Sequence, residues 1–335
     1  MKGWLLEMTK SDTNLHTIAG TSVVNRDDSR YREYRKKWSE WPETYSVGDF
    51  PLHLDIEATN LCNLKCTFCE NTYNKYQYGM MSREVWKSIL REAKENNLYS
   101  LKFTLRGEPL LHKDLPRMVR EAKEAGILDV FFNTNAVRLT PEISRMLIEA
   151  GLDRISISFE GIDKSVYEKY RVGAHFETVV ENIKQFRKIR DTLSKGKPFI
   201  RIQTVMVPEM IGKEQEFTDF WLEIADEVAY LDMRNEEENP DHTGLVSRWA
   251  CPQIWQRMSI TWDGNILPCV QDIFENIKIG NVSTISIKEA WNGEQEEHYR
   301  SLHHKGRAHE IQSCNRCPFR ENEISKLTKK LSDSS

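Results

Sequence analysis

The chain has 335 residues, and its 47 basic and 51 acidic side chains leave a formal net charge of −4. A chain of this length can bury a full core, so we expect one large domain or a large domain with a smaller attachment. The nearly balanced charge argues against a nucleic-acid coat or a membrane-surface protein. We therefore expect neither nucleic acid nor a membrane as partner.

The seven cysteines suggest metal or thiol chemistry. The N-terminal apolar run is too short for a signal peptide, and nowhere do about 20 apolar residues follow one another. We therefore expect a soluble, cytoplasmic protein. In that reducing compartment, clustered cysteines serve as metal ligands or catalytic thiols more often than as disulfides.

The predicted elements start with a loose arm. Residues 1–30 are polar and aperiodic, and the spacing of Tyr31, Tyr34 and Trp38 predicts a helix that begins near Ser29. From residue 51 onward, short β-rich runs alternate with amphipathic helical stretches. The six strand candidates are PLHLDIEAT (51–59), LKFTL (101–105), DVFFNTN (129–135), RISISFEG (154–161), FIRIQTVMV (199–207) and AYLDM (229–233).

Helices are expected between these strands. The clearest has Thr140 as N-cap and Pro141 at its first position, and it stops at Gly151. Such alternation builds a parallel sheet with right-handed crossovers. Six units are two short of an eightfold barrel. We therefore predict an α/β fold, a partial (β/α)6 TIM-like barrel over residues 49–236 that follows an N-terminal arm and helix over 1–48.

The residue composition changes after residue 234, where RNEEENPDHTG forms a polar connector. The short strands and four cysteines that follow predict a small cysteine-rich domain over 237–322, before a tail over 323–335. Neither a GxxxxGK[ST] nor a GxGxxG phosphate loop occurs.

Three cysteines follow the first predicted strand: Cys62, Cys66 and Cys69 in CNLKCTFC. Three thiolates in one tight loop fit an iron–sulfur cluster that leaves one iron open to a ligand that is not protein. The loop would lie at the C-terminal mouth of the barrel, where barrel enzymes place their chemistry. A zinc site completed by a distant residue, or a mixture of structural and redox thiols, is the alternative.

This CxxxCxΦC motif, with the aromatic Phe68 before its last cysteine, resembles that of radical S-adenosylmethionine (SAM) enzymes. The resemblance implies that SAM chelates the open iron of a 4Fe–4S cluster through its amino and carboxylate groups. It also implies that the cluster donates one electron, and that cleavage of SAM gives a 5'-deoxyadenosyl radical, which abstracts a substrate hydrogen.

Four further segments extend the resemblance over roughly residues 50–320, and they imply SAM contacts. LRGEP resembles the family's GGEP segment, except that Arg106 replaces the first glycine, and NTNA resembles a TNG turn. SISFEG resembles the ribose-contacting segment, and YEKYRVG the segment whose arginine pairs with the SAM carboxylate. The implied contact residues are Gly107 and Glu108, Asn135, Ser158 and Arg171. Taken singly, each would more often be an ordinary loop acid, strand-end hydroxyl or surface charge.

The remaining cysteines are Cys251, Cys269, Cys314 and Cys317. A four-cysteine zinc site is the alternative here. The first pair, however, spans a predicted hairpin with Asp263 and Gly264 at its turn. The pattern resembles the auxiliary-cluster domain of SPASM and twitch enzymes, in the shorter form that holds one cluster. Together, the two resemblances imply two 4Fe–4S clusters and SAM. We expect the nearby His303, His304 and His309 on a surface helix.

The cysteine count points to a reaction type. Three plus four ligands use all seven cysteines, so no thiol is left to return a hydrogen atom, which argues against a radical epimerase of that kind. A cluster closed by four thiolates has no place for substrate, and its expected task is to move an electron. That suits oxidation of a carbinol to a ketone. Glu160 or Arg234 is the candidate base, Glu160 the better proton acceptor and Arg234 a hydrogen-bonding anchor.

We therefore predict a radical SAM oxidoreductase of the twitch type, acting on a small polyhydroxylated molecule such as a sugar, nucleotide sugar or aminocyclitol. A low-potential electron donor such as flavodoxin or ferredoxin is the expected partner. A maturase of a ribosomal peptide is the first alternative, against which the short segment 1–50 argues, and a radical epimerase is another. A non-catalytic zinc-binding interaction module is a third, and the three-cysteine loop argues against it.

Overall fold

The computed structural model describes the backbone of residues 15–20 and residues 28–75, 77–193, 196–231, 249–315 and 317–324. One ten-stranded sheet runs through them in the order β1-β7-β6-β5-β4-β3-β2-β8-β9-β10. Its parallel strands are β2 (His53–Ile56), β3 (Ser100–Lys102), β4 (Asp129–Thr134), β5 (Arg154–Ser158), β6 (Phe199–Val205), β7 (Glu227–Leu231) and β8 (Arg257–Ile260). The first six overlap the six strand candidates, which confirms the partial α/β barrel with an unclosed sheet.

The N-terminal arm is not loose throughout, and that expectation was wrong. Strand β1 (Leu15–Gly20) pairs antiparallel with β7 at the edge of the sheet. An edge strand offers unpaired backbone groups to any extended segment, whatever its side chains. Ordered structure therefore starts before Ser29.

The predicted hairpin is present, and it continues the barrel sheet. Strand β8 pairs in parallel with β2, and it pairs antiparallel with β9 (Asn265–Leu267), which in turn pairs with β10 (Gly280–Asn281). Gly264 has a φ of 89° in the turn between β8 and β9. The C-terminal region thus adds strands to the sheet that carries the cysteine loop. The connector over 234–244 lies outside the described residues.

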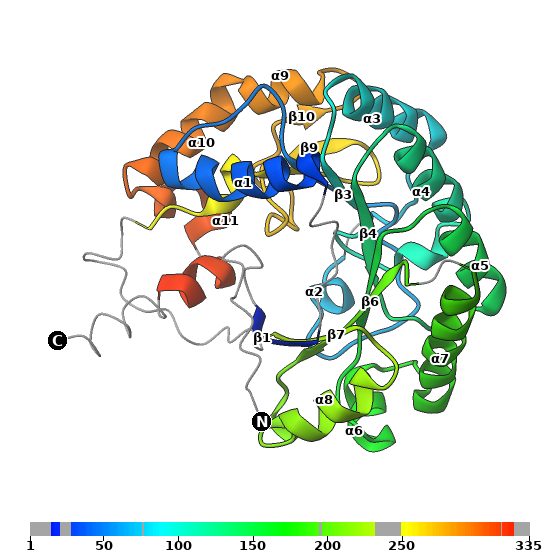
Figure 1. Cartoon of the computed structure of the whole chain (residues 1–335). Helices are drawn as coiled ribbons and strands as arrows, with labels where there is room; N and C mark the ends of the chain where they lie inside the picture. The colour runs from blue at the N-terminus through cyan, green and yellow to red at the C-terminus, as the bar shows by residue number, and fades with distance from the viewer. Residues whose placement is uncertain are drawn as a thin grey trace.

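Helices cover the outer face of the sheet (Figure 1). They are α3 (Arg83–Glu95), α4 (Leu115–Glu124), α5 (Pro141–Glu149), α6 (Lys164–Tyr170), α7 (Phe176–Leu193) and α8 (Glu214–Leu222). The predicted caps of α5 are confirmed, because the Thr140 side chain accepts a hydrogen bond from the Ile143 amide at 3.3 Å and Gly151 has a φ of 86°. The other helices are α1 (Ser29–Thr44), α2 (Glu70–Tyr73), α9 (Ile287–Asn292), α10 (Glu294–His304), α11 (Gln312–Asn315) and the 3-10 turns η1 (Pro109–Leu111), η2 (Pro208–Met210), η4 (Pro252–Trp255) and η5 (Ala308–Glu310).

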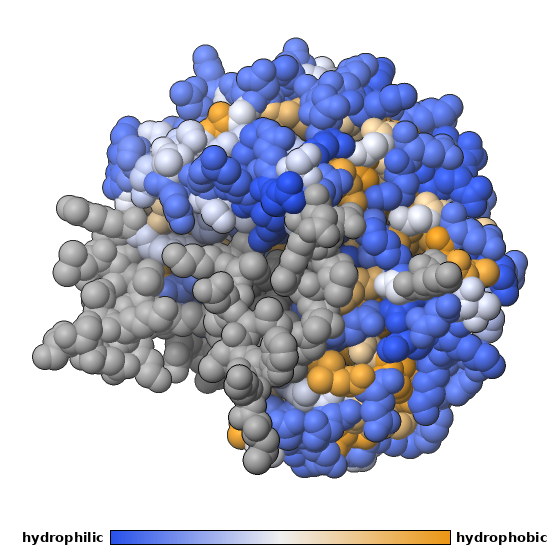
Figure 2. All heavy atoms as spheres, viewed as in Figure 1, coloured by the Kyte–Doolittle hydropathy of each residue, from blue (hydrophilic) through white to orange (hydrophobic). Residues whose placement is uncertain are grey.

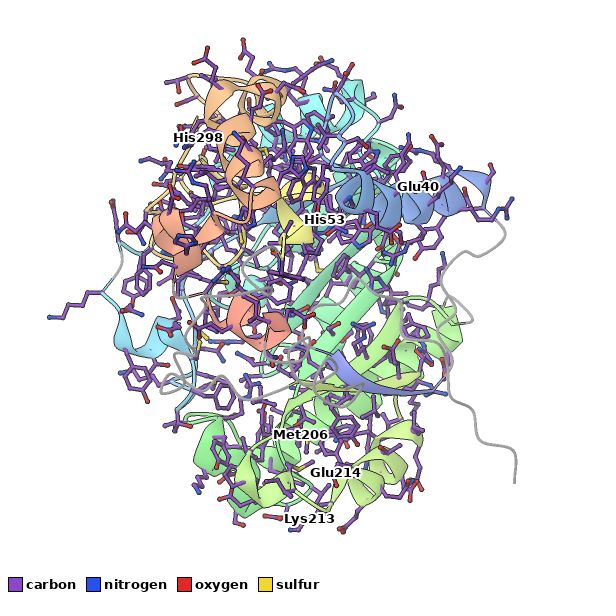
Figure 3. The ribbon with its side chains drawn as sticks, turned by 90° about the vertical axis from the view of Figure 1, so that its left-hand side faces the viewer. Glu40, His53, Met206, Lys213, Glu214 and His298 are labelled. Carbon is purple, nitrogen blue, oxygen red and sulfur yellow. The ribbon has the colours of Figure 1, made fainter. Side chains whose placement is uncertain are left out.

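Strand alternation separates an apolar outer face from a polar inner one. Leu54 and Ile56 belong to the main hydrophobic core. The alternate residues His53 and Asp55 face the barrel interior, where His53 contacts Ser100 and Asp55 contacts Arg257. Helix α1 covers the N-terminal ends of the strands. The Trp38 ring lies edge-on to His53, with 6.1 Å between ring centroids. Figure 3 shows His53 toward the middle of the molecule and Glu40 on α1.

Hydrophilic side chains dominate the visible outer rim over α3 and α9 (Figure 2). No helix in the described ranges is long and apolar enough to span a bilayer.

Helix α10 carries a carboxyl group in an unfavourable setting. Glu296 is fully buried, and its carboxylate lies 3.6 Å from the Arg300 guanidinium. Neither carboxylate oxygen has a hydrogen-bond partner among the described residues. Burial raises the pKa of Glu296 to about 8, although Arg300 opposes this shift. The folded state therefore retains a proton that the unfolded chain releases near its ordinary pKa, so folding stability falls as pH rises from about 4.5 to about 8.

We predict that Glu296→Gln removes this pH dependence. The variant should unfold about 2 °C or more above the wild type at pH 8, and the difference should shrink toward pH 5, because one pKa unit corresponds to about 1.4 kcal/mol. Thermal unfolding of anaerobic protein across this pH range measures the effect. Glu297→Gln, at an exposed position of the same helix, is the control. An equal shift at both pH values would contradict the prediction.

Candidate active site and auxiliary pocket

The three-cysteine loop follows β2 and is fixed to the segment after α6. The amide of Lys65 donates to the carbonyl of Val172 at 2.9 Å, and that of Thr67 to Tyr170 at 3.2 Å. Donors also reach the sulfurs. The Leu64 amide lies 3.4 Å from Cys62 Sγ, and the Arg171 guanidinium 3.5 Å from Cys66 Sγ. Such N–H donors stabilise thiolates, so the loop fits an iron–sulfur cluster.

Gly107 passes directly over the backbone that leads into this loop. Its φ is +71°, and a Cβ atom there would lie 2.5 Å from the Thr59 carbonyl oxygen and 2.6 Å from that of Leu61. The next amide, of Glu108, donates to the Leu61 carbonyl at 2.7 Å. Only glycine permits both the backbone conformation and the close approach.

Glu108 is buried and held by the turn after β4. It accepts hydrogen bonds from the Thr134 hydroxyl at 2.7 Å, the Asn135 amide at 2.8 Å and the Leu110 amide at 3.1 Å. Burial raises its pKa, and these donors oppose the rise. The Asn135 side chain donates to Asn63 Oδ1 at 3.0 Å, which brings the residue to the cysteine loop.

Arg171 and Glu160 form a buried ion pair beside the same loop. Glu160 is fully buried, and two guanidinium nitrogens of Arg171 donate to its two carboxylate oxygens. The hydrogen bond from the terminal nitrogen Nη2 is 2.7 Å long. Burial alone would lower the pKa of Arg171, but the pairing with Glu160 outweighs it and raises that pKa above its usual value. The guanidinium also lies 5.3 Å from the Phe68 ring centroid. The structure thus brings together three sequence-predicted residues that the sequence did not pair.

Ser158 ends β5 on the inner face, where it accepts a hydrogen bond from Gln203 at 3.1 Å. The register of β5 and β6 places Gln203 directly beside Ser158. Arg234, the other candidate for the base, lies outside the described residues.

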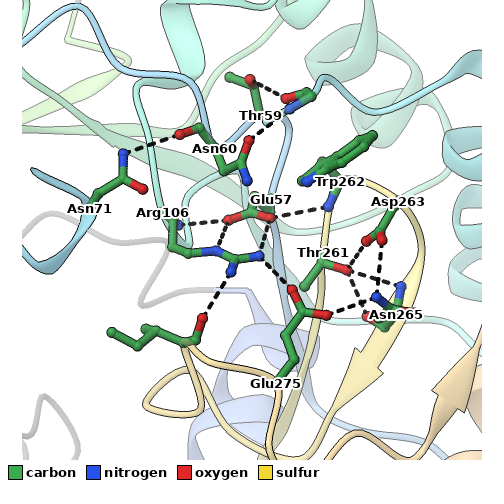
Figure 4. Close-up of polar contacts among 12 residues, drawn as sticks. Glu57, Thr59, Asn60, Asn71, Arg106, Thr261, Trp262, Asp263, Asn265 and Glu275 are labelled. Carbon is green, nitrogen blue, oxygen red and sulfur yellow. Dashed lines mark hydrogen bonds and ion pairs between the residues drawn. The ribbon is translucent and has the colours of Figure 1, made fainter. Parts of the chain in front are cut away.

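Arg106 takes up a role that the sequence did not indicate. It donates to Glu57 at 2.6 and 2.8 Å, to Glu275 at 2.9 Å and to the Ile273 carbonyl at 2.8 Å. Figure 4 shows this guanidinium between the end of β2 and the loop that carries Glu275. The Trp262 amide completes the set by donating to Glu57 at 3.3 Å. The only signal in the sequence was that an arginine stands where the family motif has glycine.

The other four cysteines line one pocket: Cys251, Cys269, Cys314 and Cys317. All seven cysteines lie in the described ranges, and none forms a disulfide. No group of three or more Cys, His, Asp or Glu side chains in these ranges converges closely enough to hold a single metal ion. Burial raises the pKa of Cys314 to about 12, so a bare thiolate is unfavourable there and a metal-bound one is compensated. The four-cysteine donor set fits an iron–sulfur cluster.

His303 corrects the expectation of a surface histidine stretch. It is 1% exposed, in the last turn of α10, and its Nε2 lies 3.5 Å from Cys314 Sγ. Its Nδ1 accepts the Cys251 amide at 3.2 Å. Burial and then Arg320 lower the pKa of His303 to about 4, so the imidazole is neutral at neutral pH. His304 and His309 are exposed, as expected. Sequence periodicity did not show that the pocket lies against this face of the helix.

Comparisons with known proteins agree with this geometry. Residues 56–207 match the radical SAM superfamily model, and residues 251–318 match the SPASM iron–sulfur cluster-binding domain. The chain therefore contains a radical SAM domain and a SPASM iron–sulfur domain. The first match implies a 4Fe–4S cluster and SAM, and the second implies auxiliary iron–sulfur. The Cys62, Cys66 and Cys69 loop falls in the first match and the four-cysteine pocket in the second.

The individual relatives are more distant. A probable GTP 3',8-cyclase of Sulfurisphaera tokodaii is 27% identical over 178 residues, which is 53% of this chain and 54% of the relative. This match therefore spans about half of the relative's length. The structure of BtrN in complex with AdoMet and 2-DOIA has a TM-score of 0.55 at 20% identity, covering 82% of this chain and 93% of BtrN. Streptococcus suis SuiB bound to S-adenosylmethionine has a TM-score of 0.60 at 19% identity, covering 82% and 74%. At these identities, the two structures show the fold alone.

We predict that Gly107→Ala disrupts the cysteine loop. The added Cβ would overlap backbone atoms that cannot move independently, so both stability and the iron content of the first cluster should fall. Gly126→Ala is the matched control, because Gly126 has a similar φ of +87° but its nearest neighbour, an Arg30 side-chain atom, is 4.0 Å away. Both variants bear the cost of a left-handed alanine, about 1–2 kcal/mol, and only Gly107→Ala adds the overlap. Equal iron loss in both variants would contradict this account.

Proposed function

We propose that this chain oxidises a carbinol carbon of a small polyhydroxylated molecule to a carbonyl. The observation that carries the proposal is the division of all seven cysteines between a three-cysteine loop and a closed four-cysteine pocket, which leaves no thiol to return a hydrogen atom. When bound, SAM and its cluster supply hydrogen-atom abstraction, and the auxiliary cluster supplies an acceptor for one electron. In the proposed reaction a hydrogen atom leaves for the 5' carbon of SAM, the hydroxyl proton goes to a base, and one electron goes to the auxiliary cluster.

The inner face of the sheet supports a small polar substrate. Partly exposed side chains near the C-terminal ends of four neighbouring strands point to this face by strand alternation. They are Lys102, Asn133, Ser158 and Gln203. Amide, hydroxyl and ammonium groups suit a molecule rich in hydroxyl groups, because each can donate a hydrogen bond. We assign the substrate to this face on that ground.

We propose SAM contacts that the placements described above support. We assign Glu108 and Gly107 to the SAM amino group, Arg171 to its carboxylate, and Phe68, Asn135 and Ser158 to the remainder of the cofactor. Glu108 and Arg171 are both buried next to the cysteine loop, where a charge-assisted hydrogen bond is strong. Arg171 enters this role already oriented by Glu160.

Loss of the hydroxyl proton requires an acceptor near the substrate. Glu160 remains our choice, because a carboxylate can accept a proton and a guanidinium cannot. Arg234 is retained as a hydrogen-bonding anchor. We also propose a flavodoxin- or ferredoxin-like electron donor and a cytoplasmic location, since thiolate ligands and low-potential donors require reducing conditions.

Peptide maturation is the second candidate. It is favoured by the likeness to SuiB, for which a structure bound to the precursor peptide SuiA is also known. The same cysteine division would serve an oxidative crosslink, so the product decides between the two candidates.

We predict that Glu108→Gln weakens SAM binding about ten- to a hundredfold, because it removes a charge-assisted hydrogen bond of about 1.5–3 kcal/mol. Both clusters should keep their iron, because none of the hydrogen bonds of the Glu108 side chain described above goes to a cysteine sulfur. Anaerobic SAM titration together with iron and sulfide analysis measures this. Glu149→Gln, on the exposed end of α5, should bind SAM like the wild type. Wild-type affinity in Glu108→Gln would refute the assignment.

Turnover tests the reaction itself. Reduced enzyme is incubated with SAM and a panel that contains an aminocyclitol, nucleotide sugars, GTP and a synthetic peptide. The expected result is substrate-dependent 5'-deoxyadenosine that carries deuterium from the attacked carbon, and a small-molecule product lighter by two hydrogens. Cys314→Ala should still cleave SAM but form little product.

Two outcomes would contradict the proposed reaction. A product of unchanged mass that contains one solvent deuterium would mean epimerisation. Loss of two hydrogens from the peptide alone would establish maturation in place of small-molecule oxidation.

A further inference from the structure

Arg320 carries a buried positive charge into the auxiliary pocket. The residue is 1% exposed and lines the pocket together with the four cysteines. None of its three guanidinium nitrogens has a hydrogen-bond partner in the described part of the chain. A guanidinium stays protonated in proteins, and burying a charge without a counter-charge is strongly destabilising. The guanidinium of Arg320 therefore needs an anion within the pocket to balance its charge.

The acid that lines the same pocket is already engaged elsewhere. Asp272 accepts hydrogen bonds from the amides of Asn276 and Ile277, both at 3.0 Å, and from the Ser313 hydroxyl at 2.6 Å. The remaining anionic groups are the cysteine sulfurs once they bind iron. A cluster closed by four thiolates has a net negative charge, and that charge grows when the cluster accepts an electron.

His303 points a second donor at the cysteine ligands. Because its Nδ1 accepts the Cys251 amide at 3.2 Å, the ring proton of the neutral imidazole is on Nε2. Nε2 then donates toward Cys314 Sγ at 3.5 Å. The amide of Gln271 also points at a sulfur, that of Cys269, at 3.2 Å, but any residue with a backbone N–H could supply that contact.

We propose that Arg320 and His303 are positioning residues that raise the reduction potential of the auxiliary cluster. Arg320 acts through its buried charge, which favours the more negative, reduced cluster, and His303 acts through the N–H···S hydrogen bond to Cys314. Net charge and hydrogen bonds to sulfur are two of the factors that set such potentials. This inference rests on the auxiliary cluster and not on the proposed substrate.

The test is an EPR-monitored redox titration of the full-length protein with both clusters and no substrate. SAM alters the spectrum of the cluster that it binds, which separates the two signals. A Cys62, Cys66, Cys69 triple-alanine variant reports the auxiliary cluster alone. Arg320→Met should lower the reduction equilibrium constant at least about tenfold, or about 59 mV for one electron. Arg320→Lys should stay within about threefold of the wild type, because it keeps the charge.

The His303 variants separate hydrogen bonding from volume. His303→Met should lower the potential, and His303→Gln should restore much of it, since the Gln amide can donate toward Cys314. Exposed controls are His304→Met and Arg307→Met, which should leave the potential unchanged. Wild-type potentials in loaded Arg320→Met and His303→Met would overturn the proposal. If Arg320→Met fails to assemble the cluster, the His303 pair decides: an unchanged potential in His303→Met would overturn the proposal.

Discussion

The buried guanidinium of Arg106 pairs with Glu57 inside the barrel and connects the barrel to the C-terminal region. Glu57 follows strand β2, Arg106 follows β3, and the same guanidinium reaches Glu275 and the Ile273 carbonyl in the C-terminal region. Removing one partner of such a pair leaves an uncompensated buried charge, which costs about 3–5 kcal/mol. Because Gly107 is the next residue, one short segment sets both the approach to the cysteine loop and the contact with the auxiliary region.

The shared sheet makes this contact rigid. Strand β8 pairs with β2 over four residues, so the region that contains the auxiliary pocket grows from the strand next to the one that leads into the three-cysteine loop. Backbone hydrogen bonds join the two regions along these strands, and Arg106 joins them at the strand ends. An electron acceptor that must stay at a fixed separation from a reaction centre benefits from such a connection, since relative domain motion is the usual expectation across a small interface.

Period and spacing in the sequence were enough to predict the six barrel strands, the caps of α5 and the hairpin at Gly264, because these depend on neighbouring residues. The division of the seven cysteines into a group of three and a group of four was also clear from their spacing. Three features of the structure could not be predicted from the sequence. Strand β1 forms through backbone pairing at an edge, Arg106 finds partners distant in sequence, and His303 is buried because a pocket lies against one face of α10. Each of the three depends on contacts between distant segments, which no local pattern records.

The two cluster sites differ in the charges around them more than in their ligands. Beside the three-cysteine loop, the guanidinium of Arg171 is already neutralised by Glu160, and Glu108 adds a second buried carboxylate. In the auxiliary pocket, Arg320 has no carboxylate partner among the described residues, and Asp272 is satisfied by its own donors. The site beside the cysteine loop has two carboxylates for one guanidinium, whereas the auxiliary pocket has one carboxylate for one guanidinium. The more positive balance in the pocket favours electron gain there relative to the first site. This arrangement of charges supports our proposal that an electron passes from the SAM side of the protein to the auxiliary pocket.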